Sequence, residues 1–390
     1  METVEQKGEL VVKTYSGLEA VLAKEMQELG FTKLREHNRA VSFRGTKEDM
    51  YRANMQLRTA LRVLKPFTEF TAKTEDQLYK NVYNIDWSQF IGLEQTFAVD
   101  SVVYSGYFTH SKYAALKTKD AIVDRIRKDK GRRPSVNVND PDLRIHLNIQ
   151  EEVIRISFDS SGGSLHRRGY KTNNLEAPLS EVLAAGMIKL CGWKVEDNML
   201  DPMCGSGTIL AEATMMLNNI PPGLVRKRFG FMNWKEFDAD IWKKVLGEAR
   251  RQATPKTGSN LFGFDRSERA IISSKENIGN TGVRRLPNIQ VADFFKTEKP
   301  ADKGTVILNP PYGKRLEQED LNKFYENIGN KLKHDYTGWD AWIISSNMDA
   351  MKFIGLKPAT KLELFNGPLE CTFNHYEMYA GSRKAVINEQ

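Results

Sequence analysis

The first 70 residues alternate between strand-like and helix-like patterns of hydrophobic and polar positions. An apolar run at 10–15 predicts a strand, and apolar residues at helical spacing after it predict a helix with Ser16 and Glu19 as its capping box. Thr46 and Asp49 are expected to cap a second helix. The remaining strands are expected at 40–44 and 61–70. This order of elements predicts a small α+β unit.

A second α+β region follows and ends near residue 165. A long stretch at 111–129 predicts a helix, and alternating apolar positions at 152–158 predict a strand. Gly162 and Gly163 then break the pattern, which suggests a hinge. The other elements expected here are a short helix at 75–83 and strands at 96–103 and 143–149.

From about residue 179 onward, short apolar strands alternate with longer helices. This alternation predicts an α/β domain with a doubly wound, mostly parallel sheet. The last two strands are joined through 366–368, so we expect an antiparallel hairpin at the edge. The stretch 213–258 separates the first helix from the second strand and is interpreted as an insertion. The strands are expected at 197–201, 261–265, 288–293, 305–309, 340–346, 360–365 and 371–379.

The first of these strands leads into a glycine-rich turn, LDPMCGSGT. It ends at Asp201 and turns through Gly205 and Gly207 into a helix, a place where doubly wound sheets bind ligands. A phosphate-binding loop requires a lysine after its last glycine, and no lysine follows Gly207. A dinucleotide motif needs a small residue at the position that Leu210 occupies. The alternative is a tight turn without a ligand. The pattern favours S-adenosylmethionine, whose positively charged amino-acid part suits Asp201.

Acidic residues at the ends of the next two strands predict further cofactor contacts. Asp265 is expected to accept the ribose hydroxyls, and Asp293 to bind the adenine amino group. Phe294 is expected either to flank the adenine ring or to pack in the core.

The fourth strand ends in Asn309-Pro310-Pro311-Tyr312, which predicts the catalytic loop. An aromatic amine is a poor nucleophile because its lone pair is delocalised into the ring. The Asn309 side-chain oxygen and the Pro310 carbonyl could accept its hydrogens and turn the lone pair toward the methyl group. Tyr312 could stack on the base. A plain strand–turn with a buried tyrosine is the alternative, and the order of motifs disfavours it.

The charge balance favours a polyanionic partner, since the formal net charge is +7 and the pI is about 9.0. The three cysteines lie far apart and the six histidines lack ligand spacing, so we expect reduced thiols and no metal site. Neither a signal peptide nor an apolar run of about 18 residues is evident, so we expect a cytoplasmic protein without a membrane span.

Two basic groups are candidates for phosphate contacts, although such runs are often only solvated faces. The first lies at the end of the helix at 111–129 and in the loop after it, and the second lies where the α/β domain begins. Their members are Arg125, Arg127, Lys128, Lys130, Arg132 and Arg133, and Arg167, Arg168 and Lys171.

On these motifs the sequence resembles the THUMP-domain class I RNA methyltransferases, a family that includes the bacterial 23S rRNA guanine-N2 methyltransferase. The stretches that carry the resemblance are SSGGSLHRRGYK, NLEAPLSEVLAAGMI, LDPMCGSGTILAEA, FGFDRSERAI and ILNPPYGKR. The resemblance implies a ferredoxin-like unit at 1–70, a THUMP RNA-binding domain at 71–165 and a Rossmann-like methyltransferase domain at 166–390. It also implies that Pro178 lies in a segment that closes over the methionine end of the cofactor. A single glycine motif matches one half of the two-methyltransferase fusions of this family.

The function expected from the resemblance is N2-methylation of a guanosine in 23S rRNA. The alternatives are guanine-N2 methylation of tRNA, adenine-N6 methylation of DNA or RNA, and a catalytically inactive RNA-binding factor. Structured RNA is the expected partner in the leading hypothesis.

Overall fold

The computed structural model describes residues 7–172, 179–256, 260–311 and 318–379, which fold into two compact units. Neither unit is one continuous stretch of chain. Unit 1 consists of residues up to Thr14, Ala23–Arg167 and Arg226–Gly247, and unit 2 of Tyr15–Leu22, Arg168–Val225 and the chain from Glu248 onward. Within the described residues, no helix combines the length and apolar character that crossing a membrane requires.

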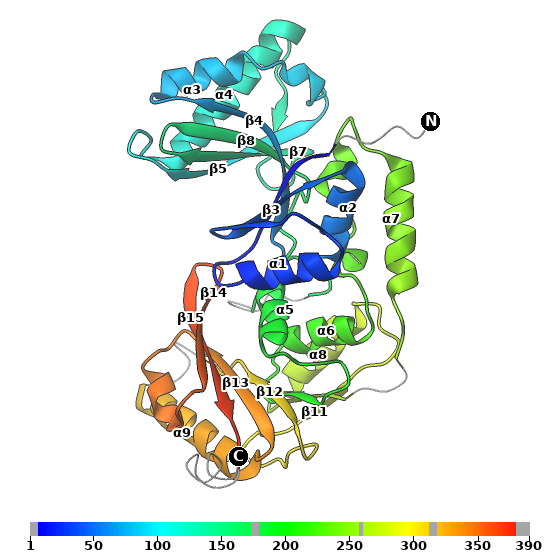
Figure 1. Ribbon diagram of the computed structural model, residues 1–390, viewed down its shortest axis with the longest axis vertical. Helices are drawn as coiled ribbons and strands as arrows, with labels where there is room; N and C mark the ends of the chain where they lie inside the picture. Colours follow the sequence, from blue (N-terminus) through cyan, green and yellow to red (C-terminus); the bar gives the residue numbers. More distant parts are fainter. Residues whose placement is uncertain (1–6, 173–178, 257–259, 312–317, 380–390) are drawn as a thin grey trace. The chain divides into compact units, whose positions relative to one another are not determined.

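Unit 1 contains one eight-stranded sheet with the order β2-β3-β1-β4-β8-β7-β5-β6. β4 pairs with β1 on one side and β8 on the other, so the sheet is continuous across the regions 1–70 and 71–165. Helices α3 and α4 lie on one face of it (Figure 1). The strands are β1 (Gly8–Lys13), β2 (Arg35–His37), β3 (Ala40–Gly45), β4 (Arg62–Thr71), β5 (Thr96–Tyr104), β6 (Ser135–Val136), β7 (Leu143–Gln150) and β8 (Val153–Asp159). The helices of this part of the chain are α1 (Glu19–Glu28), α2 (Lys47–Gln56), α3 (Glu75–Tyr83), η1 (Trp87–Gln89) and α4 (Ser111–Lys130).

The predicted helix starts differ in how they are capped. Thr46 and Asp49 form the expected capping box at the start of α2. The expected capping box of Ser16 and Glu19 does not begin α1. The Glu19 carboxylate accepts the N–H of Gly17 instead, at 2.8 Å. Gly17 has a φ of +86°, and a Cβ there would lie 2.5 Å from the Glu363 carbonyl oxygen, so a tight turn occupies the place of the expected box.

The expected insertion packs as part of unit 1. It comprises η2 (Pro222–Val225), η3 (Gly230–Asn233) and α7 (Ala239–Gln252), and its residues 226–247 belong to that unit. The ring of Phe231 stacks on Tyr51 of α2, with centroids 4.1 Å apart, and Trp242 packs edge-on against Phe231. Polar bonds add to this contact, because Glu236 pairs with Lys65 of β4 at 2.6 Å. The insertion therefore completes the aromatic core of unit 1.

The expected hinge at Gly162 and Gly163 is a packed turn. A Cβ on Gly162 would lie 2.9 Å from the backbone nitrogen of Gly230, so only glycine allows this close approach. The Arg226 guanidinium donates to the carbonyls of Gly163 and Arg167, at 3.1 and 2.7 Å. Residues of the insertion hold this turn through Gly230 and Arg226. We therefore interpret it as a packed turn within unit 1 and not as a hinge.

Unit 2 contains a seven-stranded sheet with the order β11-β10-β9-β12-β13-β15-β14. The first five strands are parallel to one another, and the hairpin of β14 and β15 joins β13 antiparallel, as the sequence predicts. The strands are β9 (Met199–Asp201), β10 (Leu261–Asp265), β11 (Asn288–Val291), β12 (Gly304–Leu308), β13 (Trp339–Ser345), β14 (Thr360–Asn366) and β15 (Leu369–Glu377). The helices are α5 (Glu181–Leu190), α6 (Thr208–Leu217), α8 (Glu268–Gly279), α9 (Gln318–Asp335) and η4 (Ala350–Ile354).

Helices cover both faces of this sheet, which confirms the doubly wound α/β fold. Figure 1 shows α5, α6 and α8 on one face and α9 on the other. Tyr325, Ile328 and Leu332 of α9 are fully buried against the apolar side chains of β12 and β13. Burial of each such side chain stabilises the fold by about 1.5–3 kcal/mol, so the sheet holds its strand ends in fixed positions.

Candidate active site

The glycine-rich turn lies at the centre of the carboxyl edge of the unit 2 sheet. β9 stands between β10 and β12, so the turn after Asp201 is flanked by the ends of the strands that carry Asp265 and Asn309. Gly205 and Gly207 have φ values of +53° and +75°. No described atom lies within 4 Å of a Cβ built on Gly205, so the backbone there is open to close approach by a ligand.

Asp265 holds this turn in place. Its Oδ2 accepts the N–H of Gly205 at 3.0 Å, and its Oδ1 accepts the N–H of Ser267 at 2.9 Å. A carboxylate oxygen has more than one acceptor direction, so both oxygens can still accept a hydroxyl. The position of Asp265 thus suits the predicted contact with a ribose, and it also orders the loop that would lie against the same ligand.

Asp201 is buried in a way that fits a positively charged ligand. It is 1% exposed, and burial raises the pKa of its carboxyl to about 8. The N–H of Met203 approaches it at 3.4 Å, and no ion pair involving it is found in the described part of the chain. A cation placed beside this carboxyl would favour its ionised form, which is what the amino-acid part of S-adenosylmethionine offers.

The next strand end places its two predicted residues differently. Asp293 is half-buried, and its Oδ1 accepts the N–H of Phe295 at 3.0 Å. Phe294 is 2% exposed and packs against Tyr336, with ring centroids 5.7 Å apart. Phe294 therefore has the core position that the sequence left open, and a contact with the adenine stays a prediction.

Asn309 follows β12 directly and carries an unusual acceptor. Its Oδ1 atom is buried, yet it has no hydrogen-bond partner among the residues that the structure describes. Leaving a buried acceptor unpaired costs about 1–3 kcal/mol, so such an atom is typical of a site that waits for a donor. Pro310 is buried and Pro311 is exposed beside it. Tyr312, the predicted stacking residue, lies outside the described residues.

The segment before α5 is anchored by buried ion pairs. Arg168 and Glu212 are 1% and 0% exposed, and their nearest atoms are 3.3 Å apart. Lys171 pairs with Glu181 at 3.3 Å and donates to the Leu179 carbonyl at 2.8 Å. The sequence predicts RNA contacts for both Arg168 and Lys171. Because their charged groups form ion pairs within the protein, they are not part of the proposed RNA interface. Pro178 lies outside the described residues.

The basic group at the end of α4 is displayed on the surface of unit 1. Arg125 is tied down, since it bonds Asp129 at 2.6 Å and the Tyr83 carbonyl at 3.2 Å. The Lys128 ammonium lies 5.8 Å from the centre of the Tyr83 ring. The exposed members are Arg127, Lys128, Lys130, Arg132 and Arg133, and Arg167 is exposed as well. This arrangement suits phosphate contacts, which stay a prediction.

Two buried polar residues of the site have no signal in the sequence pattern. Glu212 lies within the apolar run of α6, and Asn277 lies in the last turn of α8, a helix rich in polar residues. Only the tertiary fold shows that Glu212 meets Arg168 and that Asn277 reaches the glycine turn.

Three family models match consecutive parts of the chain. The RMKL-like methyltransferase domain matches residues 168–375, the RlmL ferredoxin-like domain matches 9–64, and the THUMP domain matches 72–159. These matches confirm the fold class that the sequence predicts.

The similar proteins found for this chain carry methyltransferase or methylase names. The ribosomal RNA large subunit methyltransferase K/L of Shewanella sp. (strain MR-4) is 38% identical over 373 residues, which are 94% of this chain and 52% of that protein. SMU.472, a provisionally assigned methyltransferase solved with S-adenosylhomocysteine, is 29% identical with a TM-score of 0.84 over 97% of this chain and 100% of the other. A predicted N6-adenine-specific DNA methylase from Listeria monocytogenes str. 4b F2365 is 28% identical with a TM-score of 0.83 over 96% and 97%.

The chain spans about half the length of the curated relatives it matches. Its glycine turn, its strand-end acids and the Asn309 loop all fall inside the matched methyltransferase domain. The chain belongs to the RMKL-like methyltransferase family.

Proposed function

We propose that this chain transfers a methyl group from S-adenosylmethionine to an exocyclic amine of a base in ribosomal RNA. The finer proposal is the 2-amino group of a guanosine in the 23S rRNA. The names of the curated relatives, large-subunit rRNA methyltransferases, support the RNA class. The S-adenosylhomocysteine bound in SMU.472, which is the product of methyl transfer from S-adenosylmethionine, supports the cofactor.

The observation that carries the proposal is the buried Oδ1 of Asn309, which has no hydrogen-bond partner among the described residues. It lies at the same sheet edge as the glycine turn, one strand away from Asp201. An amine that donates a hydrogen bond to this oxygen would satisfy the buried acceptor. The same bond would pull the lone pair of the amine out of conjugation and aim it at the methyl donor.

The proton that the amine loses needs no dedicated base in this scheme. Methyl transfer makes the nitrogen cationic, and the cationic nitrogen then releases its proton to water or to a neighbouring acceptor. Asp201 and Asp265 would hold the cofactor at its two ends, and the exposed cations of α4 would supply the affinity for RNA.

A methyl-transfer assay with a choice of acceptors tests the proposal. Labelled S-adenosylmethionine is offered with fragments of 23S rRNA, tRNA transcripts and duplex DNA, and the product nucleoside is identified by mass spectrometry. We expect N2-methylguanosine in the rRNA fragments. Methylation of tRNA alone would overturn the ribosomal target, and the absence of transfer to any acceptor by a chain that binds the cofactor would favour an inactive RNA-binding factor.

Adenine-N6 methylation is the second candidate. It is favoured by the similarity to the N6-adenine-specific DNA methylase from Listeria, and the Asn309 oxygen can accept an amine hydrogen from either base. N6-methyladenosine in RNA, or its deoxy form in DNA, would replace the guanine proposal in the same assay.

A further inference from the structure

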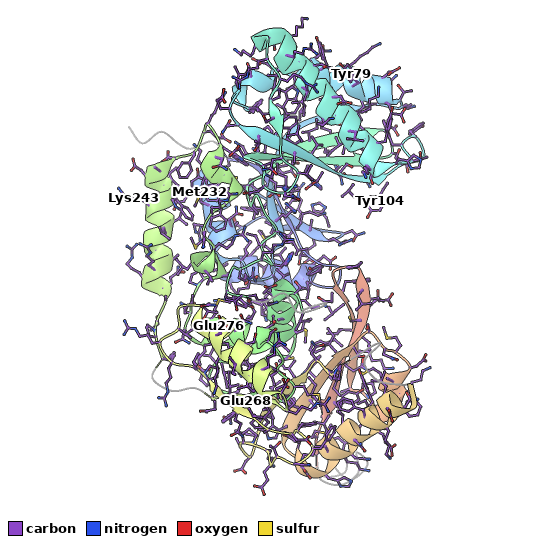
Figure 2. The ribbon with its side chains drawn as sticks, turned by 180° about the vertical axis from the view of Figure 1, so that it is seen from behind. Tyr79, Tyr104, Met232, Lys243, Glu268 and Glu276 are labelled. Carbon is purple, nitrogen blue, oxygen red and sulfur yellow. The ribbon has the colours of Figure 1, made fainter. Side chains whose placement is uncertain are left out.

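Helix α8 packs one face against the glycine turn. Figure 2 labels Glu268 and Glu276, which mark the beginning and the later part of this helix. Ser274 and Asn277 lie one helical turn apart and are 0% and 1% exposed. A Cβ on Gly207 would lie 2.2 Å from Ser274 Oγ, so the turn and the helix touch without room for a side chain.

Asn277 uses both ends of its amide on backbone groups of two different segments. Its Nδ2 donates to the Ser206 carbonyl at 2.9 Å, and its Oδ1 accepts the N–H of Thr172 at 3.2 Å. Two partners of opposite kind leave only one orientation for the amide. Asn277 therefore ties the glycine turn to the chain that precedes α5.

The Ser206 carbonyl is the part of the turn that most needs such a bond. Ser206 stands between Gly205 and Gly207, where the backbone has the greatest freedom. The N–H of Gly205 is fixed by Asp265 at 3.0 Å, and the N–H of Gly207 bonds the Cys204 carbonyl at 2.7 Å. The Ser206 carbonyl shares its peptide plane with the Gly207 N–H, so Asn277 supplies the second bond that fixes this plane.

The segment that carries Thr172 is itself firmly anchored. The hydroxyl of Tyr170 donates to Glu212 at 3.3 Å, beside the Arg168–Glu212 ion pair. Glu212 belongs to α6, the helix that follows Gly207. The turn, the start of α6 and residues 168–172 are thus joined through α8 into one rigid assembly.

We propose that Asn277 is a positioning residue for S-adenosylmethionine, which sets the affinity for the cofactor by fixing the Ser206 carbonyl. The inference rests on the proposed use of this cofactor. Asn277 need not touch the cofactor, because its effect passes through the shape of the glycine turn. Its loss should weaken cofactor binding while leaving the chemistry at Asn309 nearly unchanged.

The test compares Asn277→Asp with Asn218→Asp. Asn218 is a matched control, because it is 7% exposed and also uses both ends of its amide on backbone groups. Its Nδ2 donates to the Thr214 carbonyl at 2.8 Å, and its Oδ1 accepts the N–H of Lys256 at 2.9 Å. It lies at the far end of α6 from the glycine turn. Each substitution keeps the side-chain volume and replaces one donor with an acceptor.

Calorimetric titration with S-adenosylhomocysteine is the main readout, next to the melting temperature. We expect both variants to melt at lower temperature, and only Asn277→Asp to bind about tenfold more weakly, because its carboxylate repels the Ser206 carbonyl. The KM for S-adenosylmethionine should rise and kcat should change by no more than about threefold. At lower pH the new carboxyl becomes protonated and can donate to Ser206, so its affinity should recover relative to the native chain.

Asn277→Ser is a second variant in case the aspartate prevents folding, since serine adds no charge and is too short to bridge both partners. Affinity within twofold of the native chain for a folded Asn277 variant would overturn the inference. So would an equal loss in Asn218→Asp. If the native chain itself does not bind S-adenosylhomocysteine, the proposed function fails first, and the two failures are thereby distinguished.

Discussion

The glycine-turn region of unit 2 and the end of α4 in unit 1 hold their charges differently. The glycine-turn region buries the Arg168–Glu212 pair and the Asp201 carboxyl. The basic group at the end of α4 lies on the surface, with Arg127 and Arg133 exposed. A buried charge costs free energy unless a partner compensates it, whereas an exposed one costs little and is screened by salt. The first region therefore suits fixed positioning of groups, and the second suits contacts whose strength varies with salt.

Substitutions that should affect methyl transfer but not RNA binding, or the reverse, test this comparison. Asn309→Ala should reduce methyl transfer the most, by about a thousandfold, because the amine loses the acceptor that orients it. Binding of S-adenosylhomocysteine and of RNA should stay within about threefold of the native values. Single-turnover kinetics and calorimetry measure the two effects.

Asn198→Ala is the control for that change. Asn198 donates to the Lys303 carbonyl at the opposite, amino-terminal edge of the same sheet. It should retain methyl transfer. Equal activity in Asn309→Ala and the native chain would contradict the assignment of the catalytic loop.

Phe231→Ala should have the next largest effect, on stability alone. The side chain is fully buried and stacks on Tyr51, so its removal should cost unit 1 about 3–4 kcal/mol. Denaturant unfolding monitored by tryptophan fluorescence would detect the loss. Cofactor binding by the variant below its unfolding transition should be normal. A parallel loss of affinity would show that the insertion serves unit 2 after all.

Asp201→Asn should weaken S-adenosylhomocysteine binding about tenfold at pH 8. The pKa of the native carboxyl is raised to about 8, so the cofactor-free protein holds this group protonated at neutral pH. Affinity of the native chain should therefore rise as the pH increases from 6 toward 8 and then level off, while that of the variant stays flat. Calorimetry at several pH values makes the comparison.

The same substitution has a consequence for folding with a definite sign. Because the fold raises the pKa of this carboxyl, its contribution to stability is complete at low pH and is lost as the pH rises from about 4 to about 8. Without cofactor, Asp201→Asn should be more stable than the native chain at pH 8.5, by about 2 kcal/mol. A melting curve that shows the reverse order would contradict the destabilising burial of this carboxyl.

Arg127→Glu with Arg133→Glu should have the smallest effect, about tenfold on RNA binding at 0.15 M salt. The slope of log affinity against log salt should fall by about 1.5, since two phosphate contacts are lost. Lys24→Glu with Lys243→Glu makes the same charge change at exposed positions elsewhere, and Figure 2 labels Lys243 on α7. An equal effect of the control pair would mean that only net charge matters.

The strand ends of the site could be predicted from the sequence for a local reason. An apolar run that stops at Asp201, Asp265 or Asn309 marks where a buried strand meets solvent or ligand, and parallel strands bring such ends to one edge. The Thr46–Asp49 cap was predictable for the same reason, since both partners lie within one helical turn.

The rest depends on contacts that local patterns do not encode. Arg167 and Arg168 look alike in the sequence, yet one is exposed and the other is buried on Glu212, 44 residues away. The sequence of 213–258 indicated an insertion, but not that Phe231 would stack on Tyr51. Likewise, a strand was expected at 61–70, but not that it would pair with strands of both regions of the sheet.

The path of the insertion has a consequence for protein engineering. The chain leaves unit 2 after Val225, contributes residues 226–247 to unit 1, and returns with Glu248. A single cut near residue 167 would leave the N-terminal fragment without its aromatic layer. The C-terminal fragment would keep the amphipathic helix α7, whose apolar face would have lost its partner. Exchange of unit 1 between relatives therefore requires grafting both of its chain segments, the one before residue 168 and the one at 226–247. A gene fusion that joined the two units would likewise have had to include both segments.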